Sequence, residues 1–375
     1  MPDWNIRPGR DTDAAGFIAL IGACWSLYPG CVLDVDREEP HLRALASYYA
    51  DQGGALWVAE QSDTVIGMIA TKPLDAGPWE ICKVYVSPDL HGGGLGHALL
   101  DVAEHRAIAA GATRLALWSD TRFDRAHRFY EKRSYVRSGP IRVLHDISNS
   151  LEYAYAKPID GIEVLDAAAA ASAIARLSHI LIGCVAEGAG VSFLPPLAPE
   201  AAQAFWRAAG SKVAAGTHVL LAAWNGGVLA GTATLAMDMP QNQPHRAEVA
   251  KVLVDPAIRR RGLARALMTR VEQEATRAGR PLLLLDTQAG GAAERLYRSM
   301  GWTELGTMPG HALHMDGTFG DTVFFWKQLG SFGSGWVLLE AAGGRWLTNA
   351  ENRCQMATIT LDRRPDGITK PGSPI

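Results

Sequence analysis

An internal repeat constrains the fold of this chain more than any other feature of its sequence. The segment KVYVSPDLHGGGLGHALLDVAEHRAIAAG, which begins at Lys83, aligns without a gap with KVLVDPAIRRRGLARALMTRVEQEATRAG, which begins at Lys251, at an offset of 168 residues. Identical pairs in this register include Glu80 with Glu248, Pro88 with Pro256, Gly94 with Gly262, Leu99 with Leu267, Glu104 with Glu272 and Gly111 with Gly279. Self-similarity over this length indicates a repeated structural unit. The sequence therefore predicts two copies of one domain in tandem.

The length of the chain agrees with two domains. Its 375 residues exceed the roughly 100 to 200 residues at which a single core usually stops growing. Pro158 and Gly161 separate a strand-like run from a new helical stretch, so we expect domains at 1–160 and 161–329. Residues 330–375 begin with the linker-like GSFGSG and contain a hairpin pattern, WVLLEAAGGRWL, before a Pro/Gly-rich end. The sequence assigns this tail no function.

Each copy is expected to run as strand, turn, helix, turn and strand. A β-branched run stops before a proline, and a glycine-containing loop then opens a helix with apolar residues three and four apart. That helix ends at a glycine, and an apolar strand, an Asp-Thr pair and a tyrosine-bearing helix follow. The paired segments are strands 84–86 and 252–254, helix ends Gly111 and Gly279, strands 115–118 and 282–285, Asp120-Thr121 and Asp286-Thr287, and the helices holding Tyr130 and Tyr297.

Composition narrows the choice of partners. The chain is 48% apolar and 20% charged with a net charge of -3, so it has no global basic field for nucleic acid. Its five cysteines are odd in number and form no C-x-x-C pair, which favours a reducing cytoplasm and no metal. The first ten residues, MPDWNIRPGR, lack the basic and apolar regions of a secretion signal.

One uncharged stretch has the length of a membrane span. Residues 14–33 contain no charge over twenty positions, which reaches the length needed to cross a bilayer. Gly16, Pro29 and Gly30 interrupt this stretch. We therefore expect a buried first helix that runs into a loop, and no membrane span.

The loop before each long helix is suited to a phosphate. A helix N-terminus presents unpaired backbone N–H groups and a partial positive charge to an anion. Neither G-x-x-x-x-G-K-[ST] nor a G-x-G-x-x-G after the first strand of a βαβ unit is present, which disfavours ATP and NAD. The two loops are His91, Gly92, Gly93, Gly94, Leu95 and Gly96, and Arg259, Arg260, Arg261, Gly262, Leu263 and Ala264.

The second loop resembles the Gln/Arg-x-x-Gly-x-Gly/Ala signature of the GNAT acetyltransferase superfamily, while the first loop places His91 where that family has Gln or Arg. The resemblance implies an α/β chain of two tandem α+β GNAT domains, each with a mixed, mostly antiparallel, twisted sheet flanked by helices. It also implies acetyl-CoA as cosubstrate. The cofactor-binding residues it implies are the two loops together with Val84, Tyr85 and Val86, and Val252, Leu253 and Val254.

Acetylation of an amine needs a base, because an alkyl ammonium has a pKa near 10. Glu80 and Glu248 lie six residues before Val86 and Val254, so period-two geometry predicts that each glutamate shares a strand face with its valine. Their placement resembles that of the general-base glutamate of histone-acetylating GNAT proteins. The competing interpretation is a solvated glutamate at a strand end.

The leaving thiolate needs a proton donor. Tyr130 and Tyr297 occupy the position of the GNAT tyrosine that resembles a general acid, although Ser134 replaces the usual glycine in the first copy. The competing interpretation is an ordinary core aromatic. No Ser-His-Asp or Cys-His arrangement has supporting context, and Cys82 has no recognisable histidine partner. Direct attack by the amine is therefore preferred over an acyl-enzyme.

The acceptor regions of the two copies differ. In the first copy Tyr28 to Cys31 precede an acidic cluster, Asp34, Asp36, Glu38 and Glu39, which either attracts a cation or is a solvated loop. In the second copy SFLPPLAP from Ser192, and His245 and Arg246 beside Glu248, suggest a pocket for an amine and a carboxylate. Residues 161–328 also resemble the tabtoxin-resistance-type acetyltransferases. We expect a small amine, an amino-acid-like compound or an amine antibiotic as acceptor.

Three hypotheses follow for function. In the first, both copies are active acetyltransferases. In the second, only the C-terminal copy is catalytic and the N-terminal copy is a binding or scaffold module, packed on it as a pseudo-dimer; His91 and Ser134 motivate this. In the third, the protein acetylates protein lysines. The oligomeric state is left open.

Overall fold

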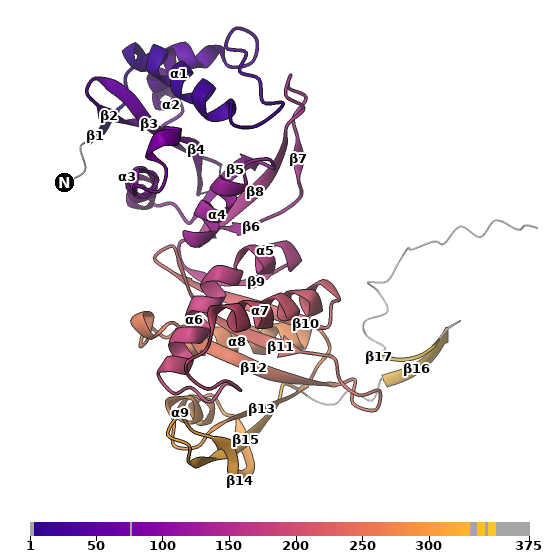
Figure 1. Ribbon diagram of the computed structural model, residues 1–375. Coiled ribbons are helices and arrows are strands. Elements are labelled where there is room, and N and C mark those ends of the chain that lie inside the picture. Colours follow the sequence, from indigo (N-terminus) through magenta and orange to yellow (C-terminus); the bar gives the residue numbers. More distant parts are fainter. Residues whose placement is uncertain (1–3, 76, 331–335, 342–343, 350–375) are drawn as a thin grey trace, which may run out of the picture.

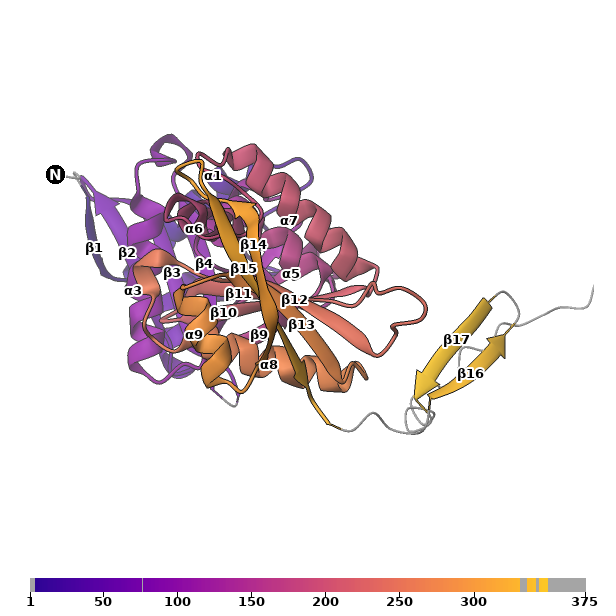
Figure 2. The same cartoon turned by 90° about the horizontal axis from the view of Figure 1, so that it is seen from below.

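The structure, a computed structural model, describes residues 4–75, 77–330, 336–341 and 344–349. Two large sheets account for most of it (Figures 1 and 2). The first has the strand order β1-β2-β3-β4-β5-β8-β6, with β7 also on β8, and the second has the order β14-β15-β13-β12-β11-β10-β9. When the second order is reversed, it matches the first strand for strand, with β9 equivalent to β1 and β14 equivalent to β6. The prediction of two mixed, helix-flanked sheets from a duplicated unit is confirmed.

The first copy contains β1 (Asn5–Pro8), η1 (Asp11–Asp13), α1 (Ala14–Trp25), η2 (Pro40–Ala44), α2 (Leu45–Asp51), β2 (Ala55–Gln61), β3 (Thr64–Pro73), β4 (Pro78–Val86), η3 (Pro88–Leu90), α3 (Leu95–Ala109), β5 (Arg114–Asp120), α4 (Asp124–Lys132), β6 (Val136–Arg137), β7 (Arg142–Val143) and β8 (Leu151–Pro158).

The second copy contains β9 (Gly161–Leu165), α5 (Ala167–Ser172), α6 (Ile174–Ala186), α7 (Pro199–Ala214), β10 (His218–Asn225), β11 (Val228–Ala236), β12 (Arg246–Val254), η4 (Pro256–Ile258), α8 (Leu263–Arg277), β13 (Leu282–Gln288), α9 (Ala292–Ser299), β14 (Thr303–Leu313) and β15 (Phe319–Gln328).

Each sheet is buried on both faces by helices. In the first copy α1 and α2 cover one face through Phe17 and Leu45, while α3 covers the other through Leu95 and Leu99. In the second copy α5, α6 and α7 cover one face and α8 covers the other. Central strands with two covered faces read as continuous apolar runs, which explains the run of buried residues 66–71 in β3.

The uncharged stretch near the start forms a core helix. α1 takes up twelve of its residues, and Phe17, Leu20 and Ile21 are buried. Within the residues that the structure describes, no helix is both long and apolar enough to cross a membrane.

The predicted tail hairpin is present as β16 (Trp336–Ala341) paired antiparallel with β17 (Gly344–Asn349). The linker prediction at 331–335 and the Pro/Gly-rich end lie outside the described residues.

The two copies contact each other head to tail (Figure 1). The end of α4 and β6 of the first copy meet α5 and the β10–β11 turn of the second. Trp224 Nε1 donates a hydrogen bond to the Ser134 carbonyl at 3.3 Å, and the Arg137 N–H donates to Ser172 Oγ at 2.9 Å. The contacting elements are different parts of the common unit, so the contact has no two-fold symmetry.

Candidate active site

Each sheet opens at its one parallel strand pair. β4 pairs with β5 only over residues 78–80 and 114–116, and β12 pairs with β13 only over 246–248 and 282–284. Beyond these short ladders β4 continues to Val86 and β12 to Val254. Their backbone N–H and C=O groups on this side therefore face an open wedge, in which an extended ligand is able to replace the missing strand.

A β-bulge at the same position in both copies accounts for the wedge. Met68 pairs with Tyr85 but Ala70 pairs with Cys82, so β4 carries one extra residue. Lys83 in β4 and Lys251 in β12 have positive φ values of 50° and 52°. A bulge bends its strand and aims side chains differently. Left-handed backbone at a non-glycine residue costs on the order of 1–3 kcal/mol and clusters at functional sites.

The bulge also overturns one prediction. Trp79 and Ile81 pack on the α3 face together with Val84 and Val86, whereas Cys82 and Tyr85 pack on the α1 face. Glu80 alternates with Trp79 and Ile81 and therefore lies on the face opposite Val86. The predicted shared face is wrong because the extra residue inverts the alternation. The equivalent bulge at Lys251 likewise puts Glu248 and Val254 on opposite faces of β12.

Both glycine loops leave open space in front of a helix. Gly94 and Gly262 are the N-cap residues of α3 and α8, with φ values of +87° and +79°. A Cβ added at either glycine would meet no atom within 4 Å. Arg260 adopts a positive φ of 65° where the first copy has Gly92, so the two backbones follow one path. Because first-turn N–H groups have no partner inside a helix, each loop forms an anion-binding concavity.

The first loop position differs between the copies. His91 Nε2 lies 3.1 Å from the carbonyl oxygen of Val86, so this imidazole turns back onto the strand end. Arg259 instead reaches α6, where it forms an ion pair with Glu187 and lies near the Cys184 thiol. That thiol donates to the Val254 carbonyl at 3.4 Å, as the Cys24 thiol does to Val86. Helices α1 and α6 are therefore equivalent as well, although they lie outside the repeated sequence segment.

Tyr130 and Tyr297 lie in equivalent helices, α4 and α9, and each is 5% exposed. Within the described chain neither hydroxyl makes a hydrogen bond. Burial raises the pKa of Tyr297 to about 12, and the Asp286 carboxylate adds to this. Burial also raises the pKa of Tyr130, with a smaller effect from Cys82. Both phenols therefore hold their protons at neutral pH. Both also belong to core clusters.

A cavity of about 540 Å³ lies beside the wedge of the second copy. Its walls are the α6–α7 loop, the end of β13 and the β14–β15 hairpin. Gln288 Nε2 lies 3.2 Å from His314 Nδ1, and His311 Nδ1 lies 3.1 Å from Thr322 Oγ1. The polar side chains in the lining are Ser192, Asp286, Gln288, His311, His314, Asp321 and Thr322. The cavity is therefore apolar in part but carries two carboxylates.

Asp286 is the group that links this cavity to the wedge. It lines the cavity, and its carboxylate acts electrostatically on both Tyr297 and Lys251. Burial lowers the pKa of Lys251, and Asp286 opposes that effect. Lys251 Nζ also lies 3.3 Å from Ser192 Oγ on the cavity wall. Asp286 is thus close enough to Lys251 and to Tyr297 to shift the pKa of each side chain.

The strand register does not preserve the Asp-Thr match between the copies. Glu80 pairs with Ala116 and Glu248 pairs with Leu284, which makes Ala116 equivalent to Leu284. Asp286 therefore corresponds to Trp118, two residues before Asp120. The Arg142 guanidinium lies over the Trp118 ring at 4.1 Å. The first copy has a cation-capped tryptophan where the second has a carboxylate.

The two glutamates predicted as general bases, Glu80 and Glu248, have different neighbours from Asp286. Glu80 lies 3.6 Å from Lys72 and next to the Cys82 thiol, whose pKa is raised to about 12, mainly by burial. Glu248 is 49% exposed in its side chain and lies 3.0 Å from Arg246. The described lining of the 540 Å³ cavity includes neither Glu248 nor Arg246. The predicted carboxylate-binding role of His245 and Arg246 stays a prediction, and any such pocket lies apart from this cavity, where β12 begins.

The acidic cluster of the first copy is used within its own loops. The Asp34 carboxylate accepts backbone N–H groups of residues 36 and 37, and Asp36 pairs with Arg43. Glu38 accepts the Ile147 N–H at 2.6 Å, and Glu39 pairs with Lys83. The cluster therefore organises the α1–α2 loop.

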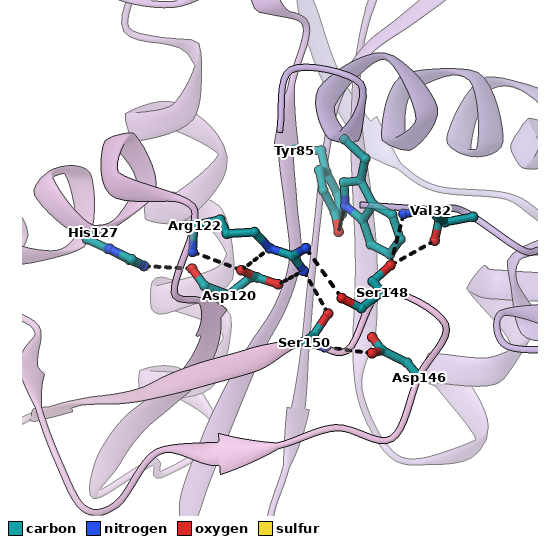
Figure 3. Close-up of polar contacts among 9 residues, drawn as sticks. Val32, Tyr85, Asp120, Arg122, His127, Asp146, Ser148 and Ser150 are labelled. Atoms are coloured by element: carbon teal, nitrogen blue, oxygen red, sulfur yellow. Dashed lines mark hydrogen bonds and ion pairs between the residues drawn. The ribbon is translucent and has the colours of Figure 1, made fainter. Parts of the chain in front are cut away.

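That loop is fastened across the end of β5, as Figure 3 shows. The Val32 N–H donates to Ser148 Oγ at 2.9 Å, which joins the α1–α2 loop to the β7–β8 loop. Arg122 forms an ion pair with Asp120 and donates to Ser150 Oγ at 3.0 Å. Trp25 Nε1 donates to the Tyr85 hydroxyl at 3.1 Å. This end of the first copy thus carries different side chains from those that line the 540 Å³ cavity of the second copy.

Comparison with known proteins identifies a family. The model of the acetyltransferase (GNAT) family matches residues 20–135 and 190–302, one stretch in each copy. Similar solved structures include yncA, a putative acetyltransferase from Salmonella typhimurium with its cofactor acetyl-CoA, at 24% identity, a TM-score of 0.40, and coverage of 47% of this chain and 97% of that chain. A ribosomal-protein-alanine N-acetyltransferase from Brucella melitensis has 23% identity, a TM-score of 0.38, and coverage of 44% and 98%.

Proposed function

This chain belongs to the acetyltransferase (GNAT) family, and on that premise we propose that it transfers an acetyl group from acetyl-CoA to the primary amine of a small molecule, with the second copy as its main catalytic centre. One observation carries the proposal. The second copy combines a strand wedge, an open helix N-terminus and a 540 Å³ cavity whose carboxylate, Asp286, is on β13, one of the two strands of the wedge.

The residues of the second copy fit acetyl-CoA. The open space at Gly262 and the first turn of α8 suit the pyrophosphate, because the helix end offers unpaired donors. Arg259, Arg260 and Arg261 add positive charge there. The unpaired edge of β12 beside Val252 and Val254 suits an extended, amide-bearing arm. Bound there, acetyl-CoA supplies a thioester that an amine is able to attack.

The proton leaves the amine through a carboxylate. Asp286 lines the cavity and is exposed, so a cationic amine in the cavity has this anion beside it. Glu248 is the other candidate, but it is occupied by Arg246 and stands outside the lining. We assign the general-base role to Asp286. Burial raises the pKa of Tyr297 to about 12, so its phenol is protonated at neutral pH. We assign to Tyr297 the donation of a proton to the leaving sulfur.

The acceptor is proposed to be a small amine. Asp286 and Asp321 favour a cation, and the apolar walls from Phe193 to Pro195 favour a compact organic body. The two histidines provide further hydrogen-bonding positions. Amino-acid-like compounds and amine antibiotics satisfy this description. Protein lysines are the alternative acceptor and are distinguished by the same assay.

A second activity in the first copy is supported by its own contacts. Glu80 lies beside the Cys82 thiol, and Tyr130 is buried in the cluster on the α3 face. The first copy has Trp118 at the position of Asp286. Any acceptor of this copy would therefore meet an aromatic ring in place of a carboxylate. The first copy is therefore either a separate transferase based on Glu80 or a module that only binds.

The test is a CoA-release screen on the full chain with amines, amino acids, amine antibiotics and lysine peptides. We expect turnover with at least one free small amine, lost in Tyr297→Phe and retained in Tyr130→Phe. Turnover with peptides alone would replace the small-molecule proposal by the protein-lysine alternative. Loss in Tyr130→Phe but not in Tyr297→Phe would move the main catalytic centre to the first copy.

A further inference from the structure

A second cavity, of about 370 Å³, lies between the two copies. Its first-copy wall is the C-terminal half of α3 and the end of α4, and its second-copy wall is α6 and the β10–β11 turn. The glycine loop is at the opposite end of α3, so this cavity is separate from the acetyl-transfer site. Its charged lining consists of Asp101, Glu104, Lys132, Arg133, Lys157 and Arg176.

One charged pair in this lining belongs to the common fold. Lys157 pairs with Glu104, and the Tyr135 hydroxyl donates to Glu104 at 2.9 Å. The second copy repeats this arrangement, since Lys327 lies 2.8 Å from Glu272 and Trp302 Nε1 lies 3.2 Å from it. A carboxylate with a lysine and an aromatic donor, buried in the first copy and half-buried in the second, therefore supports each copy and needs no ligand to explain it.

The other first-copy charges around the cavity are not required by the fold. By the repeat and the matching tyrosines, Asp101, His105, Lys132 and Arg133 correspond to four uncharged residues of the second copy: Thr269, Gln273, Ser299 and Met300. The second copy folds around the same core without them. These charges are specific to the side of the first copy that faces the cavity.

Domain docking does not account for them either. The polar bonds that join the copies within the described residues involve Ser134, Arg137, an Arg114–Glu163 ion pair, and the bonds of Ile159 and Asp160 to the β10–β11 turn. Among the described residues, Arg133 pairs within its own copy, with Asp101 and Glu104. Within the described chain the side chains of Lys132 and His105 make no hydrogen bond or ion pair. Their donors are available to something in the cavity.

The second copy contributes a fixed cation from the opposite wall. Arg176 Nε donates to the Leu229 carbonyl at 2.8 Å, and its guanidinium pairs with Asp255 outside the lining. An arginine has five N–H donors, so this anchoring leaves some of them free. Four cations and two anions line the cavity, and Asp255 pairs with Arg176 from outside the lining, which leaves an excess of one positive charge.

We propose that the cavity between the copies binds a small organic anion with a phosphate or carboxylate group, held by Lys132 and Arg133 of the first copy and Arg176 of the second. The volume lies within the range of small-molecule sites. Arginine and lysine are the residues that recognise such anions. A ligand held from both walls also stabilises the contact between the copies.

The test is calorimetric titration of the full chain with inorganic phosphate and, separately, with citrate. Saturating CoA is present throughout, so that the glycine loops are already occupied. We expect saturable binding of one probe, at least tenfold weaker in Lys132→Ala and in Arg176→Ala. Arg277→Ala removes an exposed arginine outside the cavity lining and is the charge-matched control, with unchanged binding.

The two probes distinguish the anion: tighter binding of phosphate indicates a phosphorylated ligand, and tighter binding of citrate a carboxylate. Circular dichroism of each variant separates loss of binding from loss of fold. Binding of neither probe, or binding that Lys132→Ala and Arg176→Ala leave unchanged, overturns the proposal.

Discussion

At the scale of single residues, the second copy differs from the first most at one position of its central strands. Asp286 stands where Trp118 stands in the first copy, and each is positioned by the same strand pairing. A carboxylate there acts on Lys251 and Tyr297, whereas the tryptophan is covered by Arg142. A single substitution in a shared frame thus changes the chemistry of the site.

The general-base assignment predicts unequal effects of two isosteric substitutions. We expect Asp286→Asn to lower kcat/KM for the amine by about 10²–10⁴-fold, the usual contribution of a general base. Glu248→Gln is expected to lower it less than about threefold, because its partner Arg246 is outside the cavity lining. Steady-state kinetics of both variants make the comparison. A large loss in Glu248→Gln with little change in Asp286→Asn would reverse the assignment.

The proton-donor assignment predicts a pH profile. Burial raises the pKa of Tyr297 to about 12, and a raised pKa keeps the phenol protonated at every pH below that value. Activity of the wild type should therefore show no falling limb from this group between about pH 6 and pH 10. Tyr297→Phe should lower kcat by about 10²-fold at every pH without changing the shape of the profile. A falling limb in this range that Tyr297→Phe removes would contradict the raised pKa, and an unchanged kcat in Tyr297→Phe would contradict the proton-donor assignment.

At the scale of elements, the bulge and the glycine loop are the two devices that turn a sheet into a binding site. The bulge separates β12 from β13, and Gly262 starts α8 with an open N-terminus. Both depend on left-handed backbone, at Lys251 and at Gly262. Glycine adopts that conformation without the steric cost that a side chain brings.

Substitution of the N-cap glycine should separate binding from stability. Gly262→Val places a β-branched residue at a φ of +79°, which we expect to cost about 1–3 kcal/mol and to weaken acetyl-CoA binding by at least tenfold. Gly279→Val, at a φ of +66° beyond the other end of α8, is the matched control. It should lose similar stability in a denaturant titration but keep its affinity for acetyl-CoA. Equal affinity losses in both variants would contradict a specific role for the loop.

At the scale of the whole molecule, the chain is two similar units in a head-to-tail contact that uses different faces of each. Trp224 and Ser172 of the second copy meet the α4–β6 end of the first. This end carries Lys132 and Arg133, which have no charged counterparts in the second copy. The contact between the copies therefore creates a cavity that is lined by residues of both and that neither copy has alone.

The joined molecule should bind acetyl-CoA at two unequal classes of site. The second loop offers three arginines, while in the first His91 is turned onto the Val86 carbonyl. Salt screens interactions between exposed charges. We therefore expect the affinity of the tighter class for acetyl-CoA to fall more steeply with salt, because its loop carries more positive charges. Calorimetric titration at two ionic strengths measures this. Gly262→Val should remove the tighter class and Gly94→Val the weaker one; loss of the tighter class in Gly94→Val would contradict the ranking.

The sequence by itself determined the duplication, the order of elements from β4 to α4 and from β12 to α9, and the family. These follow from local rules: prolines and glycines end elements, and apolar spacing fixes whether a segment is strand or helix. The repeat added independent support, because each element was read twice. Tyr130 and Tyr297 were placed in equivalent helices for the same reason.

Only the tertiary structure decided the geometry of the site. The face of Glu80 was mispredicted because a positive φ at Lys83 inserts one residue into the alternation, and no residue type announces it. Asp286 was aligned with Asp120 because matching letters cannot reveal a two-residue slip that strand pairing corrects. The 540 Å³ cavity joins three segments far apart in the chain. Sequence patterns report local conformation, whereas register, bulges and cavities depend on contacts between distant segments.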